Sequence, residues 1–485
     1  MHTSPLALRS KTSRQAPQSR LSRAFGRRFV VSLFAAAALP LVLGTAHAAG
    51  SDAAKLGKDL TPVGAERAGN KEGTIPAWSP ERQDLPGFVA GKTLRQSVWK
   101  HKDDQALYSI NASNVDKYAD KLSPGQVALI KNTPDFKMEV FPTRRTCDVP
   151  KFVVDNTAKN VSAAKIGEDG WSLKEAFVPG VPFPMPTQGI EAIWNMKMRY
   201  RGAGAVGVGT TYLSPRRGSS EWILPKAEQT NFIPWGAPGS RKLSEIGSAN
   251  FSTYFTFLYP VALAGQSVIV TDYLDQSGSD AYYYFPGQRR VRRMPAYAYD
   301  AQQIGFENQY AVDDTAVFTG APDRFDWKIV GKREMIVPYN AFGALDFQSE
   351  WSTIVKPNGL VANHRHYELH RVWVLEATIK AGMRHTSPKR VYYLDEDSWN
   401  AVFAEDYDTQ GKLWKVREGY LVPIYETGSC DVEAFAQYNF TEGRFLFDFS
   451  PIGTGRDAIW YVQPTGPAMK SSFYTSDNLR ALSTR

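Results

Sequence analysis

Histidine and glutamate side chains lie close together in the second half of the chain, in a pattern that could bind a metal ion. Alternate positions there carry His364, His366, Glu368 and His370. On a β-strand these side chains would share one face, and imidazole nitrogen and carboxylate oxygen are both zinc ligands. The first and the last would, however, lie about 20 Å apart along a strand that rises about 3.3 Å per residue. We therefore expect a polar ladder between strands and no metal site.

A second group that could bind a ligand is the basic cluster of residues 289–293, which contains four arginines. It follows the aromatic run 282–285, and a Pro-Gly pair between the two segments predicts a hairpin. Arg290 and Arg292 would then share one face of the returning strand. Their guanidinium groups could bind an anionic head group, whereas the structural alternative is pairing with surface carboxylates such as Asp280.

Two further strings resemble known motifs, but their context does not support the chemistry. Residues 202–207 match the glycine fingerprint of dinucleotide-binding folds, yet the expected helix precedes the glycines instead of following them. Residues 406–411 resemble the start of a calcium loop, whose twelfth position here is Arg417 instead of glutamate. The sequence contains neither Gly-x-Ser-x-Gly nor His-Glu-x-x-His. We expect no cofactor and no catalytic residue, and predict that the protein is not an enzyme.

The elements that must position these side chains are mostly β-strands beyond residue 250. Aromatic and β-branched residues are concentrated there in segments that turn signals often separate, which favours an antiparallel meander. The expected strands are 251–259, 267–273, 280–285, 289–294, 325–330, 333–337, 364–376, 390–394, 413–416 and 434–440. The best helix is predicted over 190–201, because Ile190, Ile193 and Trp194 follow the 3.6-residue period and Gly202 stands at the position of a cap.

The first 48 residues have the features of a secretory signal peptide. Arg27-Arg28 precede an apolar run, and Ala46-His47-Ala48 matches the small-x-small pattern that signal peptidase recognises. The alternative is a membrane anchor, but a span needs roughly 20 apolar residues and Pro40 interrupts a shorter run. No cysteine follows the cleavage position directly, so we expect a periplasmic protein that is not lipid-anchored.

Residues 49–187 are expected to be irregular with short helices, and residues 188–485 to form the β-rich part. Proline and glycine interrupt the first of these regions repeatedly. Short helices are predicted over 114–122 and, after the Ser123-Pro124 start signal, over the residues that follow. The predicted organisation is therefore a signal peptide (1–48), an irregular region (49–187) and an antiparallel β region with a covering helix (188–485).

Charge and cysteine content further limit the possible partners. The chain has 57 lysines and arginines against 49 aspartates and glutamates, and removal of the seven basic residues of the leader leaves 50 against 49. A nearly neutral protein has no electrostatic reason to bind nucleic acid, so no nucleic-acid partner is expected. Cys147 and Cys430 are the two cysteines, and in an oxidising compartment we expect a disulfide between them, with two buried thiols as the alternative.

Several segments resemble the bacterial domain-of-unknown-function family 1329. They are Leu60-Thr61-Pro62, Gly73 to Trp78, Phe183-Pro184-Met185-Pro186, Glu368 to Trp373 and Asp395 to Trp399. This family is similar to the LolA/LolB-like lipoprotein-carrier superfamily and to outer-membrane lipoprotein-sorting relatives. The resemblance implies a mainly β (α+β) fold, in which a curved antiparallel sheet forms an open half-barrel with helices over its concave face and an irregular N-terminal extension.

The same resemblance implies a periplasmic carrier or binding protein for a lipid or other hydrophobic molecule, working with envelope export machinery. The implied partners are a resistance-nodulation-division exporter and an outer-membrane protein; the alternative function is a non-catalytic structural or adaptor subunit of an export complex. A curved aromatic sheet closed by a helix can enclose an apolar cavity, although the same composition could form a filled core. We expect the ligand-binding residues to be Tyr282, Tyr284, Arg290, Arg292, Trp194, Glu368, His370 and Trp373.

We predict that signal peptidase cleaves after Ala48, because Ala46 and Ala48 place small side chains at the two positions that the peptidase requires. N-terminal sequencing of the exported protein should begin at Ala49. A start well upstream or downstream of this position would contradict the prediction.

Overall fold

The structure is a computed structural model that describes residues 53–80 and 85–483. The expected signal peptide, residues 1–48, and its cleavage position lie outside the described residues. Among the described helices, none combines the length and the apolar composition needed to cross a membrane.

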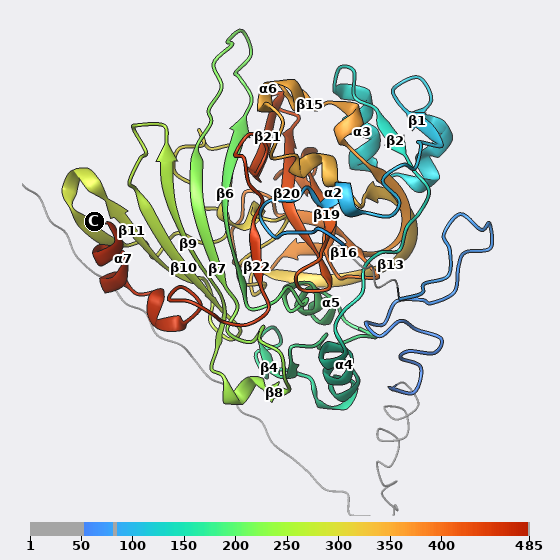
Figure 1. Cartoon of the computed structure of the whole chain (residues 1–485), viewed down its shortest axis with the longest axis horizontal. Coiled ribbons are helices and arrows are strands. Elements are labelled where there is room, and N and C mark those ends of the chain that lie inside the picture. The colour runs from blue at the N-terminus through green and yellow to red at the C-terminus, as the bar shows by residue number, and fades with distance from the viewer. Residues whose placement is uncertain (1–52, 81–84, 484–485) are drawn as a thin grey trace, which may run out of the picture. The chain divides into compact units, whose positions relative to one another are not determined.

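One large sheet of 16 strands dominates the described part of the chain (Figure 1). Its neighbouring strands are, in order, β13 (Phe325–Pro338), β16 (Tyr367–Ile379), β17 (Lys389–Asp395), β18 (Ala401–Tyr407), β19 (Leu413–Ile424), β20 (Ser429–Asn439), β21 (Arg444–Ser450), β6 (Gly204–Leu213), β7 (Lys226–Phe232), β9 (Ala249–Tyr259), β10 (Ser267–Tyr273), β11 (Ser279–Phe285) and β12 (Arg290–Arg293). These neighbours pair antiparallel. The expected fold class, a mainly β protein with an open, curved antiparallel sheet, is confirmed.

The sheet consists of two meanders joined side by side. The first runs from β6 to β12 and the second from β13 to β21, and the pairing of β21 with β6 joins them. Three short strands extend this sheet: β22 (Ile459–Tyr461) pairs with β6, while the hairpin of β1 (Tyr108–Ile110) and β2 (Met138–Val140) meets β16 through one parallel pair. Strands close in space at the joint are therefore far apart in the sequence.

The two faces of the sheet are covered by different elements. On one face, called the inner face below, lie helix α5 (Gly189–Lys197) and the covering segment, residues 294–324 between β12 and β13. On the opposite face of the first meander, helix α7 (Ser476–Ser483) packs against β10, β11 and β12. Because side chains alternate along each strand, the register decides which residues meet the covering segment and which meet α7.

The remaining elements are short and surround the sheet. The helices are α2 (Arg95–Val98), α3 (Pro124–Asn132), α4 (Lys151–Ala163) and α6 (Trp351–Ile354). The 3-10 helices are η1 (Val115–Lys121), η2 (Leu243–Glu245), η3 (Pro286–Gln288), η4 (Val312–Asp314), η5 (Phe342–Leu345), η6 (Ala362–His364) and η7 (Ser471–Phe473). The small strands are β3 (Lys165–Ile166), β4 (Leu173–Glu175), β5 (Phe177–Val178), β8 (Arg241–Lys242), β14 (Val355–Lys356) and β15 (Gly359–Leu360).

Local sequence signals located several of these elements. The predicted start at Ser123 is the N-cap of α3, where the Ser123 hydroxyl accepts a hydrogen bond from the Gln126 backbone and Gln126 accepts one in return. The predicted helix over 190–201 corresponds to α5 but ends earlier, at Lys197. The strand predicted to begin at His364 begins at Tyr367, because His364 ends the 3-10 helix η6.

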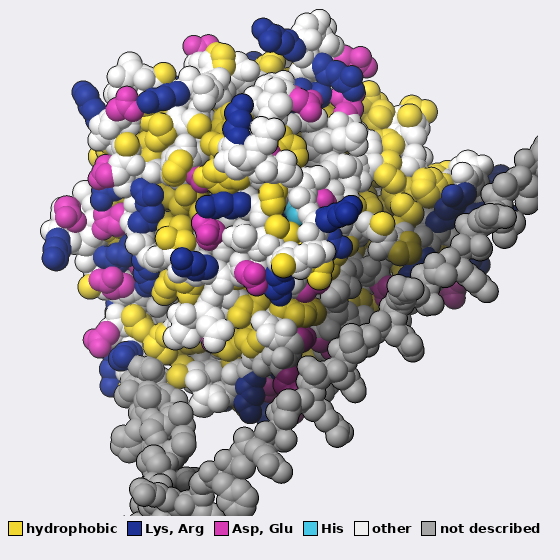
Figure 2. Space-filling model, turned by 180° about the vertical axis from the view of Figure 1, so that it is seen from behind, with side chains coloured by type: hydrophobic (Ala, Val, Ile, Leu, Met, Phe, Trp, Pro, Cys, Tyr) yellow, Lys and Arg dark blue, Asp and Glu magenta, His cyan; other side chains and the backbone are white. Residues whose placement is uncertain are grey.

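Charged side chains of both signs occur on the face seen in Figure 2. Lys and Arg side chains are interspersed there with Asp and Glu side chains, among hydrophobic and uncharged ones. This mixture matches the balanced charge of residues 49–485. Such a face has no single-sign field that would steer a charged partner.

A disulfide connects the irregular region to the second meander. Cys147 and Cys430 are bonded, with their Cα atoms 5.5 Å apart. Both flanking backbones are also held by side chains: Trp78 Nε1 donates to the Cys147 carbonyl at 3.1 Å and Asn400 Nδ2 to the Cys430 carbonyl at 3.2 Å. The bond therefore lies in a packed, hydrogen-bonded setting.

We predict that replacing both cysteines with serine lowers the free energy of unfolding substantially, because the bond closes a loop with a sequence separation of 283 residues. The chain-entropy model gives about 5 kcal/mol for so long a loop, and measured effects are often smaller. Urea unfolding of the oxidised protein and of the variant checks this. Thiol labelling of the denatured, unreduced protein should detect no free cysteine, and two labelled thiols would contradict the pairing.

A buried group of charges fixes the covering segment to the sheet. This anchoring ion cluster consists of Asp313 and Asp314 from the covering segment, Arg390 from β17, Asp406 from β18 and Arg417 from β19. Arg390 lies 2.8 Å from Asp313 and 2.7 Å from Asp314, and Arg417 contacts Asp314 and lies 2.6 Å from Asp406. Burial alone would raise the pKa of Asp313 and Asp314, but the neighbouring guanidinium charges outweigh it and lower the pKa of both.

We predict that Asp314→Asn lowers the free energy of unfolding by about 3 to 5 kcal/mol, because it leaves buried arginine charge uncompensated. Asp116→Asn is the matched control: Asp116 is exposed and pairs with Lys131, so its loss should cost under about 1 kcal/mol. Urea unfolding of both variants at neutral pH measures the difference, and equal effects would contradict the anchoring role.

The same cluster predicts a loss of stability in acid. The folded-state pKa of Asp313 and Asp314 lies below that of an unfolded aspartate, about 3.9. Their contribution is therefore complete above about pH 4 and is lost as the pH falls toward the folded-state pKa. Between pH 5 and pH 2 the wild type should lose more stability than Asp314→Asn, and parallel curves would contradict this.

Candidate ligand-binding cavity

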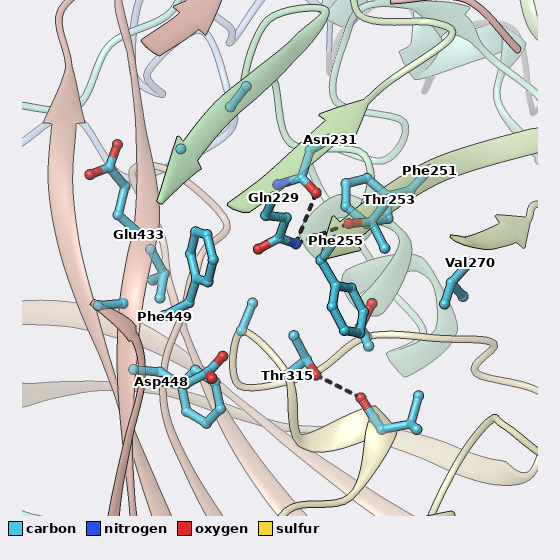
Figure 3. A pocket seen from close by; sticks show the side chains of 18 of the residues that line it. Gln229, Asn231, Phe251, Thr253, Phe255, Val270, Thr315, Glu433, Asp448 and Phe449 are labelled. Carbon is cyan, nitrogen blue, oxygen red and sulfur yellow. Dashed lines mark hydrogen bonds between the residues drawn. The ribbon is translucent and has the colours of Figure 1, made fainter. Parts of the chain in front are cut away.

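A cavity of about 240 Å³ lies between the inner face of the sheet and the covering segment (Figure 3). Strands β7, β9 and β10 form one wall and β20 and β21 form the facing wall, while Thr315 of the covering segment lines a third side. The end of α5 also reaches the cavity, through Met196 and Lys197. The cavity therefore lies where the two meanders meet.

The wall on the side of the first meander is mainly apolar. Phe251, Phe255 and Val270 point into the cavity (Figure 3). They do so because the register places alternate residues of β9 on the inner face and aligns them with β10, where Thr253 pairs with Val270. An apolar ligand would therefore meet aromatic rings along the length of β9.

The polar side chains of this wall are largely satisfied by one another. Gln229 Nε2 donates to Asn231 Oδ1 and to Thr253 Oγ1, each at 3.0 Å (Figure 3). A polar group that already has a partner is cheaper to cover with an apolar molecule than one without. This part of the wall is thus compatible with a hydrophobic ligand.

The facing wall bends sharply at Phe449. The pairing of β21 with β6 shifts register between Phe447 and Ser450, and Phe449 has a φ of 43°, in the left-handed region that non-glycine residues seldom adopt. Its ring projects into the cavity (Figure 3). Gly209 on β6 makes room for it, since a Cβ there would lie 2.7 Å from the Phe449 ring. The irregular joint between the meanders thus shapes the cavity.

Two acidic side chains on this wall are engaged in local interactions. Asp448 accepts hydrogen bonds from the hydroxyl groups of Tyr310 and Thr211, each at 2.7 Å, and burial raises its pKa. Burial, together with the negative charge of Asp457, also raises the pKa of Glu433 to about 8. Trp460 Nε1 donates to Glu433, which lies 3.6 Å from Arg95. At neutral pH, Glu433 therefore largely retains its proton.

Three basic side chains, called the cationic end below, also line the cavity: Lys197, Arg199 and Arg201. Helix α5 ends at Lys197, and the backbone leading into β6 places Arg199 and Arg201 at alternate positions beyond it. Arg199 lies 2.7 Å from Asp431 on β20, and Lys197 Nζ donates to the Gly320 carbonyl of the covering segment. The cavity therefore has apolar walls and one cationic end.

None of the eight residues expected from the sequence to bind the ligand is among the described residues that line this cavity. Tyr284 is buried beside Leu479 of α7, and Tyr282 packs against the same cluster, so both face away from the cavity. The register places Tyr283 and Phe285 on the inner face instead. Arg290 and Arg292 lie exposed on β12, the last strand of the sheet.

The two tryptophans have packing roles. Trp194 is fully buried in α5, where its Nε1 donates to the Trp171 carbonyl at 2.6 Å. Trp373 lies on β16, which three other strands separate from β20, and its ring stacks at 5.9 Å on that of Trp399. Lys332 Nζ lies 4.4 Å from the Trp373 ring centroid. Neither tryptophan meets the cavity.

Glu368 and His370 belong to a buried polar network on β16. Glu368 lies 3.0 Å from both His366 Nε2 and His370 Nε2, and accepts a hydrogen bond from Asn340 Nδ2 at 2.8 Å. Burial alone would raise the pKa of Glu368, but the hydrogen bonds with His366 and His370 lower it to about 2. His364 lies outside this network. The imidazole groups of His366 and His370 both contact the Glu368 carboxylate.

The same network contains a set of groups that could hold a cation. One atom each of His370, Asp395 and Asp397 lies within 4.8 Å of the others. Arg145, however, donates to both oxygens of Asp397, at 2.7 and 2.8 Å. Burial, with the negative charge of Asp397, raises the pKa of Asp395 well above its usual value. Asp397 is therefore already bound by a cation of the protein itself, the Arg145 guanidinium.

One sequence pattern could have predicted the cationic end, but the predicted helix over 190–201 included these residues. In Lys197-Met198-Arg199-Tyr200-Arg201, basic and bulky apolar residues alternate. Alternation with period two is typical of an extended segment with one polar side. A single helix over 190–201 would have distributed these three charges around its surface. The early end of α5 brings them to one side of the chain.

Comparison with known proteins identifies the family. The family model described as "Protein of unknown function (DUF1329)" matches residues 109–480. The uncharacterized protein PA3922 of Pseudomonas aeruginosa is 37% identical over 400 residues, which cover 81% of this chain and 86% of that protein.

Solved structures with partial similarity include a DUF1329 family protein from Desulfovibrio piger, with 16% identity and a TM-score of 0.37 over 56% of this chain and 92% of that one. Another is the LolA superfamily protein NE2245 from Nitrosomonas europaea, with 11% identity and a TM-score of 0.36 over 60% of this chain and 99% of that one. The extent of the family match, together with the similarity to the Pseudomonas protein, confirms the resemblance found in the sequence: the chain belongs to the DUF1329 family.

Proposed function

We propose that this protein binds a lipid or another hydrophobic molecule in the cavity under the covering segment and carries it in the periplasm. The observation that carries the proposal is the cavity itself, whose walls are formed by Phe251, Phe255, Val270 and Phe449. The periplasmic location rests on the signal-peptide features of residues 1–48.

The physical chemistry of the walls favours an alkyl or aromatic ligand. Each methylene group that moves from water into such a cavity gains about 0.8 kcal/mol. The volume of about 240 Å³ lies just below the roughly 300 to 1,000 Å³ of pockets that enclose drug-sized ligands. A cavity of this size supports binding of one chain or one small ring system rather than the several chains of a lipoprotein.

An enzymatic function receives less support from the same residues. Lys197 and Glu433 are two cavity side chains whose pKa values are shifted to about 8, the range that acid–base chemistry at neutral pH needs. Glu433 is held by Trp460 and Arg95, whereas Lys197 donates to the Gly320 carbonyl, so the two belong to separate sets of contacts. We therefore propose a non-catalytic protein.

A second candidate function, as an adaptor in an envelope export complex, is favoured by one surface feature. The turn between β9 and β10 exposes Leu258, Tyr259 and Val261, and Val261 is 88% exposed. Adjacent exposed apolar side chains are typical of contact sites for a partner. An exporter of the resistance-nodulation-division type and an outer-membrane protein are the partners we propose, and a carrier that docks at this turn would combine both functions.

We predict that Val270→Trp weakens the binding of hydrophobic ligands at least tenfold, because the indole would occupy the cavity. The probe is the uncharged fluorophore N-phenyl-1-naphthylamine, displaced by dodecan-1-ol. Val330→Trp is the matched control, since Val330 is 59% exposed on β13 and lies outside the cavity.

The control should bind both molecules as the wild type does. Overpacking typically costs about 1 to 3 kcal/mol of stability, so the melting temperature of each variant is measured alongside. Wild-type protein that binds neither molecule, or a folded Val270→Trp variant that binds both unchanged, would contradict the proposed function.

A further inference from the structure

We propose that the ligand of this cavity is an amphiphile with an anionic head group, and that Lys197 and Arg201 bind that head group at the cationic end. The inference rests on the proposed function, because it assumes that an apolar chain occupies the cavity. It adds the charge of the ligand and the residues that recognise it.

The first step is the placement of the three cations. Lys197, Arg199 and Arg201 are separated by single residues after the end of α5, and all three line the cavity. Gly202 ends this run with a φ of 76°, and a Cβ there would lie 2.5 Å from the Tyr461 carbonyl oxygen. The close approach of β22 therefore fixes where the run turns into β6.

The second step concerns hydrogen-bond partners: Arg199 has them within the protein, whereas Arg201 and Lys197 keep donors without a partner among the described residues. Arg199 Nη2 lies 2.7 Å from Asp431 Oδ1, and its Nη1 donates to the Met196 carbonyl at 2.7 Å. Arg201 reaches the other oxygen of Asp431 only at 3.6 Å. Its buried Nε has no hydrogen-bond partner among the described residues.

Lys197 is the more isolated of the two. Its Nζ donates to the Gly320 carbonyl, and no carboxylate of the described residues forms an ion pair with it within 4.0 Å. Asp272 is the nearest carboxylate that influences it, and Asp272 accepts hydrogen bonds from Ser279 at 2.5 Å and Thr319 at 3.5 Å. An ammonium group has three donors, so Lys197 retains donors for a ligand.

The third step is a count of charges. The charges that act on Lys197 and Arg201 are those of Arg199, Asp431 and Asp272, so three cations face two carboxylates in this group and one positive charge is in excess.

Two further carboxylates that line the cavity have partners of their own: Asp448 accepts hydrogen bonds from Tyr310 and Thr211, and Asp457 pairs with Arg95. Glu433 does not compensate the excess charge either, because it belongs to the contacts of Arg95 and Trp460. A buried charge without a counter-charge is costly, and an anionic ligand would remove that cost.

The pKa values of these groups agree with the excess charge. Burial lowers the pKa of Lys197 to about 8, with the charges of Arg199 and Arg201 adding to the effect and Asp272 opposing it. Burial and Arg199 likewise lower the pKa of Arg201 to about 10. At pH 7 both groups still carry their protons and can bind an anion.

The fourth step connects the head-group site to the apolar walls. The Arg201 guanidinium lies 4.8 Å from the centroid of the Phe251 ring. Phe251 continues along β9 into Phe255, and both rings project into the cavity (Figure 3). A head group held by Arg201 would therefore place its chain directly against the aromatic wall.

The test compares two ligands of equal chain length, dodecanoate and dodecan-1-ol, as competitors of N-phenyl-1-naphthylamine at pH 7. The wild type should bind dodecanoate at least tenfold more tightly than dodecan-1-ol. Lys197→Met should abolish this preference, because it should weaken the binding of dodecanoate at least tenfold more than that of dodecan-1-ol. Lys328→Met is the matched control, because Lys328 is exposed on β13 and lies outside the cavity, and it should retain the preference.

The melting temperature of each variant shows whether it is folded. If Lys197→Met does not fold, Arg201→Gln provides the second variant and should reduce the preference in the same way. The preference of the wild type for dodecanoate should also decline above pH 8, because Lys197 loses its charge there. The charged and polar groups around Lys197 are Asp272, Arg199, Arg201 and the Gly320 carbonyl.

The outcomes separate the inference from the proposed function. A wild type that binds neither ligand contradicts the proposed function. A wild type that binds dodecan-1-ol as tightly as dodecanoate, or a folded Lys197→Met variant that keeps the preference, overturns the inference alone. Loss of the preference in an Arg290→Gln/Arg292→Gln variant but not in Lys197→Met would move the head-group site to β12 and overturn it as well.

Inorganic phosphate and dodecyl phosphate distinguish the possible sources of the anion. Dodecyl phosphate should displace N-phenyl-1-naphthylamine at least as well as dodecanoate does. Inorganic phosphate at millimolar concentration should displace neither the fluorophore nor the two amphiphiles. Inorganic phosphate that binds as tightly as dodecanoate would identify a small-anion site and overturn the assignment to an amphiphile.

Discussion

The anchoring ion cluster is the interaction on which the rest of the architecture depends. The covering segment has little regular secondary structure, so backbone ladders cannot fix its position over the sheet. Asp313 and Asp314 do so through directional contacts with Arg390 and Arg417, deep in the molecule. Apolar packing alone is non-directional and would permit many placements of such a segment. Once this end of the segment is fixed over the second meander, the remainder must pass over the joint with the first, and the space that it leaves there is the cavity.

The cavity thus combines two properties that arise from different parts of the fold. Its apolar walls come from strand alternation, which any antiparallel sheet with one covered face would provide. Its cationic end comes from the end of α5 and the residues that follow, because Lys197 is the last residue of the helix and Arg199 and Arg201 beyond it line the same cavity. The irregular pairing around Phe449 supplies the width that regular pairing of β21 with β6 would remove. Together these features produce a cavity that has both aromatic walls and basic side chains.

Sequence patterns predicted the fold class well and the site poorly, for identifiable physical reasons. Strands rich in aromatic and β-branched residues, the capping signal at Ser123 and the helix around Trp194 are local features, and they appear in the structure where the sequence placed them. The face that each strand presents to the cavity depends on pairing between distant segments. The Tyr282 to Phe285 run shows this, since either pair of alternating aromatics could face inward and only the position of α7 decides between them. The anchoring ion cluster joins residues about 70 to 100 positions apart, and no local pattern indicates such contacts.

The joint between the meanders has a consequence for the order in which the protein matures. Leu213 on β6 pairs with Leu446 on β21, so the wall of the cavity is completed by contacts between the middle of the chain and its last strands. Contacts of such sequence separation form slowly, because loop-closure entropy opposes them. A chain that is synthesised from its N-terminus cannot complete the wall of the cavity until β21 has been made. The first meander must therefore remain without its partner strand β21 until the second meander has been synthesised, and the cavity is among the last features of the fold to form.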